Sequence, residues 1–141
     1  MAESGYVSER PLTLLVNEEN GFKKAIAAHL AESWTSGGVP VEVRVLPWEE
    51  YAAALAAGDF DLYYGEARLT ADWDLGSLLE PGGRLNYGHW SNPDTSRLLT
   101  ELAGAQDRTA AMRALCAHLK DQAPILPVCF KSTSVLTQAG V

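Results

Sequence analysis

The stretch Gly58-Asp59-Phe60-Asp61-Leu62-Tyr63-Tyr64 decides how the chain can fold, because it joins a helix, a strand and a highly charged loop. Gly58 is placed to end a helix, and residues 60–64 form an aromatic and aliphatic run that predicts a strand. Ligands of open α/β sheets bind beyond the carboxyl ends of strands, so the loop after residue 64 is a candidate binding site. A solvated acidic loop with one local Arg–Asp pair is the alternative interpretation. The loop's candidate residues are Glu66, Arg68, Asp72, Trp73 and Asp74.

The residues before this stretch alternate between strand and helix patterns. Residues 12–16 predict a buried strand, and Asn20 is suited to cap a helix that ends at Gly37-Gly38. Residues 41–45 predict a second strand, and Pro47 suits the first turn of a helix over residues 48–57. The order β-α-β-α-β predicts an α/β fold with a mostly parallel sheet flanked by helices.

The spacing of the first helix places one set of side chains on a common face: Phe22, Ile26, His29, Leu30, Ser33 and Trp34. We expect that face to pack on the sheet, with His29 half-buried rather than acting as a ligand.

The second half of the chain predicts helices rather than strands. Asp74 is suited to cap a short helix that Pro81 breaks, and Asn92-Pro93-Asp94 begins a helix with its leucines inward. Asp107 or Thr109 begins the last long helix. Pro124 and Pro127 imply that residues 128–131 form an edge or crossover strand. We expect residues 1–10 to be a flexible N-terminal tail and residues 11–141 to be a single α/β lobe.

The composition is that of an ordinary globular domain, with 141 residues of which 47% are apolar. A net charge of −7 without a Lys/Arg cluster argues against nucleic acid and anionic membranes as partners. No apolar run approaches the ~18 residues of a membrane span, so this segment predicts no direct membrane insertion. The first residues lack the features of a signal peptide, although an export signal could lie outside this chain.

The two cysteines, Cys116 and Cys129, match no zinc or redox spacing. Cys116 falls on a predicted helix and Cys129 on a predicted strand. We expect buried free thiols, and a disulfide remains an alternative because its geometry cannot be judged from spacing.

The chain offers little that resembles a catalytic motif. Asp72 and Asp74 could form an acid/base pair, which keeps a small enzyme or an interaction domain open as an alternative function. The histidines His29, His89 and His118 have no metal-binding spacing, and no GxSxG, P-loop or GxGxxG occurs. We therefore expect no catalytic residue, metal or cofactor.

Binding without catalysis suits the side chains better. Arg68 offers a fork for a carboxylate, and Asp72 or Glu66 offers an acceptor for an amine. Trp73, Tyr87 and Trp90 offer flat surfaces, although each could equally pack in the core. Together these groups could recognise a zwitterionic ligand such as a peptide.

Four passages together resemble the extracellular solute-binding proteins of ABC importers, in the family that includes oligopeptide-, dipeptide- and nickel-binding proteins. The likeness lies in their order and spacing over about residues 12–130. The passages are Gly37 to Val43, Trp48-Glu49-Glu50-Tyr51 with Gly58 to Leu62, Ala71-Asp72-Trp73-Asp74 with Asn86 to Asp94, and Arg113 to Pro127.

The resemblance implies the second lobe of a periplasmic-binding-protein-like (type II) fold, cut from a longer two-lobed protein. It implies a peptide-like solute, the missing first lobe and ABC permease subunits as partners, and an extracellular or periplasmic lipoprotein anchored through a segment outside this chain. It places the ligand beside Glu66, Arg68, Asp72, Trp73, Asn86 and Tyr87. In the family an aspartate matching Asp72 pairs with a peptide's amino terminus. A tryptophan common just before it is replaced by Leu69, beside Arg68, so this chain could select an anionic group instead.

Overall fold

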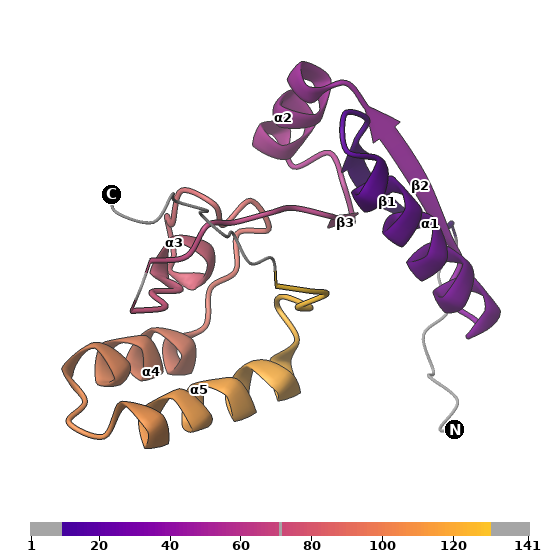
Figure 1. Ribbon diagram of the computed structural model, residues 1–141. Helices are drawn as coiled ribbons and strands as arrows, with labels where there is room; N and C mark the ends of the chain where they lie inside the picture. Colours follow the sequence, from indigo (N-terminus) through magenta and orange to yellow (C-terminus); the bar gives the residue numbers. More distant parts are fainter. Residues whose placement is uncertain (1–9, 71, 131–141) are drawn as a thin grey trace, which may run out of the picture.

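The computed structural model describes residues 10–70 and 72–130. These residues form two groups of elements, which Figure 1 shows side by side and joined by an extended segment. The first group, called the sheet half here, contains β1 (Leu12–Asn17), α1 (Gly21–Ser36), β2 (Val41–Leu46), α2 (Trp48–Ala57) and β3 (Leu62–Tyr63). The second, the helical half, contains α3 (Gly76–Leu79), α4 (Pro93–Gly104) and α5 (Arg108–Gln122). The predicted tail lies outside the described residues except for Arg10, as does everything after Phe130.

The sheet is parallel, with the strand order β2-β1-β3, as the β-α-β-α-β pattern predicts. Leu12 pairs with Val41 at one side of β1, and Leu14 pairs with Leu62 at the other. The third strand has only two residues, so it is shorter than the predicted residues 60–64. Asp61, directly before β3, adds side-chain hydrogen bonds where the strand begins. Its carboxylate accepts two hydrogen bonds from Arg10, of 2.7 and 2.8 Å, and one from the Thr13 amide, of 2.8 Å. These bonds, those from Arg10 above all, lower the pKa of Asp61.

Both faces of β1 are covered, because side chains of a strand alternate between faces. Leu14 and Val16 pack on α1 at one face. Leu15 packs on α2 at the other face. The predicted face of α1 is partly wrong: Phe22 is 53% exposed and His29 is exposed, whereas the small residues Ala27 and Ala31 are buried. Alanines allow the helix backbone to lie close to the sheet, so they, and not the aromatic side chain, set which face turns inward.

The helix boundaries in this half follow the predicted caps. The Asn20 side-chain oxygen accepts a hydrogen bond from the Lys23 amide at 3.1 Å and begins α1. Gly58 ends α2 with a φ of 70°, in the left-handed region that favours glycine.

The helical half surrounds its own core of leucines: Leu79, Leu98, Leu99, Leu102 and Leu115. Asn92 and Asp107 accept hydrogen bonds from the first turns of α4 and α5, as predicted. The predicted strand at residues 128–131 is not present as far as Phe130, where the described residues end. Both cysteines are free thiols and both are exposed, so the expectation of buried thiols is wrong.

The seam between the halves is built from aromatic side chains. The Tyr63 hydroxyl donates a hydrogen bond of 3.3 Å to the Leu85 carbonyl oxygen. The rings of Tyr63 and Tyr87 meet edge-on, with their centroids 5.9 Å apart. β3 therefore both closes the sheet and contacts the loop that leads into α4.

Candidate ligand-binding site

The carboxyl edge of the sheet has the geometry of a ligand-binding crevice. The connection through α1 leads from β1 to β2, and the connection through α2 leads back past β1 to β3. The two helices cover opposite faces, so the strand order reverses between β1 and β3. Ligands of open α/β sheets bind at such a reversal, outside the carboxyl ends of the strands.

Asn17 ends β1 at this reversal and is buried, with 7% of its surface exposed. Its Nδ2 donates a hydrogen bond of 3.0 Å to Glu19 Oε2. Its Oδ1 is the one buried side-chain oxygen or nitrogen without a hydrogen-bond partner in the part of the chain that the structure describes. Buried polar atoms are nearly always paired, so this oxygen is free to accept a hydrogen bond from water or from a ligand.

Charged and aromatic residues also follow β1, β2 and β3 at this edge of the sheet. The Lys23 ammonium in the first turn of α1 lies 3.5 Å from Glu66 Oε2, and the lysine side chain is only 13% exposed. Trp48 opens α2 with 58% of its surface exposed, and its amide donates a 2.7 Å hydrogen bond to Glu19 Oε1. The hydrogen bond from Asn17, followed by backbone hydrogen bonds, lowers the pKa of Glu19 and keeps that carboxylate ionised. This edge therefore combines a donor-seeking oxygen, a cation and an indole surface.

The loop that carries Asp72 lies at the helical half instead. Thr70 organises it: the Trp73 amide donates to its carbonyl oxygen at 3.0 Å, and the Asp74 amide donates to its hydroxyl at 3.2 Å. A hydrogen bond from the Thr70 hydroxyl is the largest of the effects that lower the pKa of Asp72. Arg108 Nη2 donates a hydrogen bond of 2.8 Å to the Asp72 carbonyl oxygen. This bond holds the loop against α5.

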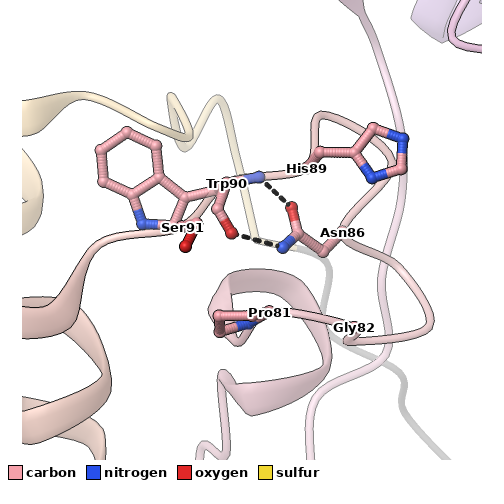
Figure 2. A pocket seen from close by; sticks show the side chains of 6 residues that line it. All are labelled: Pro81, Gly82, Asn86, His89, Trp90 and Ser91. Carbon is pink, nitrogen blue, oxygen red and sulfur yellow. Dashed lines mark hydrogen bonds between the residues drawn. The ribbon is translucent and has the colours of Figure 1, made fainter.

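Asn86 organises the loop between α3 and α4 (Figure 2). Its Nδ2 donates to the carbonyl oxygens of Glu80 and Trp90 at 2.9 and 2.8 Å, and its Oδ1 accepts from the Trp90 amide at 2.8 Å. All of these bonds are internal, which gives the Asn86 side chain a structural task. A pocket of about 200 Å³ lies beside it, lined by Pro81, Gly82, Asn86, His89, Trp90 and Ser91.

The six residues predicted for the site do not share one cavity. Glu66 lies beside Lys23 at the sheet, Arg68 is exposed, and Tyr87 packs against the sheet core. Asp72 and Trp73 line a pocket at the helical half, and Asn86 lines the other. The sequence prediction did not include Asn17, Lys23 or Trp48 as candidates, although each directly follows a predicted strand or opens the helix after it, which is the signal that could have found them.

Within residues 10–70 and 72–130, no group of three or more His, Cys, Asp or Glu side chains is arranged to hold a metal ion. None of the described helices has the length and apolar character that crossing a bilayer requires.

The fold matches one lobe of a periplasmic-binding-protein-like fold, and the similar solved structures include peptide- and nickel-binding proteins. The murein tripeptide binding protein MppA of Escherichia coli superimposes with a TM-score of 0.72 and 26% identity, over 85% of this chain and 25% of its own. The oligopeptide-binding protein AppA of Bacillus subtilis, solved with a nonapeptide, superimposes with a TM-score of 0.67 over 81% of this chain and 24% of its own. AppA is only 19% identical, so it supports the fold alone.

A curated relative agrees with this fold. The probable deoxycholate-binding periplasmic protein YgiS of Escherichia coli K12 is 29% identical over 93% of this chain. No protein-family model matches the chain. The chain spans about a quarter of the length of these relatives, 26% in the case of YgiS.

Proposed function

We propose that this chain forms one wall of a solute-capturing site in an ABC importer's substrate-binding protein and performs no catalysis. The solute is a peptide or a related small molecule held at the carboxyl edge of the sheet. The observation that carries this proposal is Asn17 Oδ1, a buried acceptor without a partner at the point where the strand order reverses.

The proposal gives each neighbour of Asn17 a task. A donor of the solute, either N–H or O–H, bonds Asn17 Oδ1. An anionic group of the solute competes with Glu66 for the Lys23 ammonium, because the Glu66 side chain is half-exposed and its carboxylate lies 3.5 Å from that ammonium. The Trp48 indole covers an apolar portion of the solute.

The proposal extends to the rest of a longer protein. A first lobe would close over this edge and bury the solute, and ABC permease subunits would receive it. An extracellular or periplasmic location, with an anchor in a segment outside this chain, follows from the same reasoning. MppA and YgiS support the location, because both are described as periplasmic.

The alternative of a small enzyme with Asp72 and Asp74 as an acid/base pair has less support. Asp74 Oδ1 accepts a 2.8 Å hydrogen bond from the Gly76 amide at the start of α3. Leu75, and not the predicted Asp74, is the N-cap residue of α3, but this hydrogen bond gives the Asp74 carboxylate a structural task beside the helix.

The test compares Asn17, the last residue of β1, with Asn20, the N-cap residue of α1. Asn17→Ala removes the unpaired acceptor, and Asn20→Ala removes only the cap of α1. We expect Asn17→Ala to weaken solute capture about tenfold, the value of one lost hydrogen bond at a buried site. Asn20→Ala should cost about 1 kcal/mol of unfolding free energy and leave affinity unchanged.

Three probes represent the solutes in the names of the relatives: trialanine, deoxycholate and the nickel–histidine complex, each titrated calorimetrically. Equal affinity of the Asn17→Ala variant and the unchanged chain for the captured probe would contradict the assignment of Asn17. Failure of all three probes to bind, including to the longer natural protein, would overturn the solute-capturing function itself.

A further inference from the structure

β2 leaves one edge of the sheet open. It stands at the end of the strand order, on the opposite side of β1 from β3 (Figure 1). The Leu12 amide donates to the Pro40 carbonyl oxygen at 2.8 Å, and the Glu18 amide donates to the Leu46 carbonyl oxygen at 2.9 Å. In a parallel pair only alternate residues of a strand bond to its neighbour, so residues 42, 44 and 46 direct their hydrogen bonds to β1. Residues 41, 43 and 45 therefore direct their N–H and C=O groups outward, where no other strand of the described residues pairs with β2.

Most of these outward groups are available to another strand. The Val41 amide donates to Thr35 Oγ1 at 3.0 Å, and this bond occupies it. The carbonyl oxygen of Val41 and both backbone groups of Val43 and Val45 are left at the edge. A row of such groups on an edge strand is a template for pairing with a further chain.

The side chains of this edge are complementary to a second copy of themselves. The strand reads Val41-Glu42-Val43-Arg44-Val45, so opposite charges lie at equal distances on either side of Val43. Both charged residues are exposed. When a second copy runs antiparallel with the two Val43 residues opposite each other, Glu42 of each copy faces Arg44 of the other. Val41 faces Val45 in the same register, and this contact covers the Val45 side chain, which is 44% exposed.

The backbone gives a second, independent argument for this register. Opposite residues of an antiparallel ladder alternate between pairs that exchange hydrogen bonds and pairs that do not. Centring on Val43 makes hydrogen-bonded pairs of the valines, which are the residues with outward backbone groups. Glu42 and Arg44 then form the pairs without backbone bonds, where opposite side chains lie closest. Centring on Glu42 or on Arg44 would instead place like charges opposite each other, which is unfavourable.

The present contacts of Arg44 are compatible with this pairing. Its Nη1 lies 2.7 Å from Asp59 Oδ2 in an exposed ion pair, with the arginine side chain 45% exposed. Because a guanidinium has five N–H groups, Arg44 can bind Asp59 and a carboxylate of a second copy together. Charges on an edge strand commonly keep other chains away. A single sign of charge would do so here, whereas two signs placed about Val43 attract a second copy.

We infer that the open edge of β2 is a self-association surface, on which a second copy of this chain continues the sheet antiparallel with the two Val43 residues opposite each other. The combined sheet has the strand order β3-β1-β2-β2-β1-β3. Each copy contributes one short strand, so the interface is small and the dimer should have a Kd on the order of 0.1–1 mM. The inference goes beyond the proposed function, because the partner is a protein and none of the residues assigned to the solute takes part.

The test is a charge exchange on the whole chain, followed by sedimentation equilibrium at concentrations around the expected Kd. Arg44→Glu places Glu42 opposite a second carboxylate, and Glu42→Arg places two guanidinium groups opposite each other. We expect each variant alone to self-associate at least about tenfold more weakly than the unchanged chain. An equimolar mixture of the two variants restores opposite charges at every pair, so it should associate about as strongly as the unchanged chain. Restoration by mixing also shows that neither variant has lost its fold.

A matched variant controls for the change in net charge. Arg97 on α4 resembles Arg44, since it is an exposed arginine that pairs with an exposed aspartate, Asp94, at 3.3 Å. Arg97→Glu should change self-association less than about twofold, because its position lies outside the sheet. Amide hydrogen exchange then locates the contact. In the unchanged chain, the amides of Val43 and Val45 should become protected as the concentration rises through the Kd.

A chain that stays monomeric at every concentration would overturn the inference. Undiminished self-association of Arg44→Glu, or a mixture that associates no better than the single variants, would overturn it as well. Protection of Val43 and Val45 that does not depend on concentration would mean that another part of the same chain covers the edge, and this result too would reject a second copy as the partner.

Discussion

The sheet half and the helical half are stabilised in different ways. In the sheet half, hydrogen bonds join strands that are distant in sequence, and β1 lies between β2 and β3 with both faces covered. In the helical half, leucine packing and helix caps provide the order, and its described residues include no strand. The candidate residues named from the sequence and from the structure divide between the two: Asn17 and Lys23 lie in the first and Asp72 in the second. A solute that contacts residues of both halves therefore requires the halves to be held together.

Two matched leucine-to-alanine substitutions test whether the halves unfold separately. Leu15 and Leu115 are both 0% exposed, one in each core. Replacing either with alanine should cost about 2–5 kcal/mol of unfolding free energy, through lost burial and the cavity left behind. Denaturant unfolding measures the total cost, and hydrogen exchange locates it.

If the two halves unfold separately, Leu15→Ala should accelerate hydrogen exchange in β1, β2 and α2 and leave α4 and α5 protected. Leu115→Ala should do the reverse. Uniform acceleration across both halves in either variant would show one cooperative unit and would remove the distinction drawn here.

Much of the sheet half could be predicted from sequence because its signals are local and agree with each other. Residues 12–16 and 41–45 have strand patterns, and Asn20 and Gly58 mark helix ends by known backbone chemistry. The length of β3 could not be predicted, because pairing depends on a partner strand and not on the apolar run itself. Likewise, Phe22 faces outward because the close approach of Ala27 sets the helix rotation, which spacing alone does not reveal.

The candidate site was harder to predict than the fold. Position after a strand pointed to the edge of the sheet, and the charged loop led the sequence prediction to Arg68 and its neighbours. The proposal of Asn17 depends on its burial, and burial of a polar residue at a strand end leaves no mark in the sequence. Glu66 and Asp72 also lie in different halves, Glu66 beside Lys23 of α1 and Asp72 beside Arg108 of α5.

Tyr51 allows the sheet half to be destabilised selectively by pH. Burial, with smaller contributions from Tyr63 and Tyr87, raises its pKa to about 12 from an ordinary value of 10.0. Because the folded-state pKa is the higher one, the stabilisation is complete below about pH 10 and is lost as the pH rises toward 12. The loss should reach at most ~3 kcal/mol, at 1.36 kcal/mol for each pKa unit.

The measurement is the unfolding free energy between pH 8 and 12, compared with that of Tyr51→Phe. The variant loses the 3.2 Å hydrogen bond to the Tyr64 carbonyl oxygen and about 1 kcal/mol at neutral pH, but it should show a shallower alkaline decline. An identical decline in both proteins would assign the alkaline sensitivity to other groups.

The smallest expected effect concerns the seam and shows how the halves are joined. Tyr63→Phe deletes the hydroxyl that donates to the Leu85 carbonyl oxygen but keeps the edge-on contact with Tyr87. The loss of unfolding free energy should be about 1 kcal/mol or less. Because Tyr63 joins β3 to the loop before α4, hydrogen exchange should become faster at β3 and at residues 85–87 while both cores stay protected. Unchanged exchange at both places would mean that the ring contact alone holds the halves together, and faster exchange in both cores would mean that Tyr63 supports folding in general.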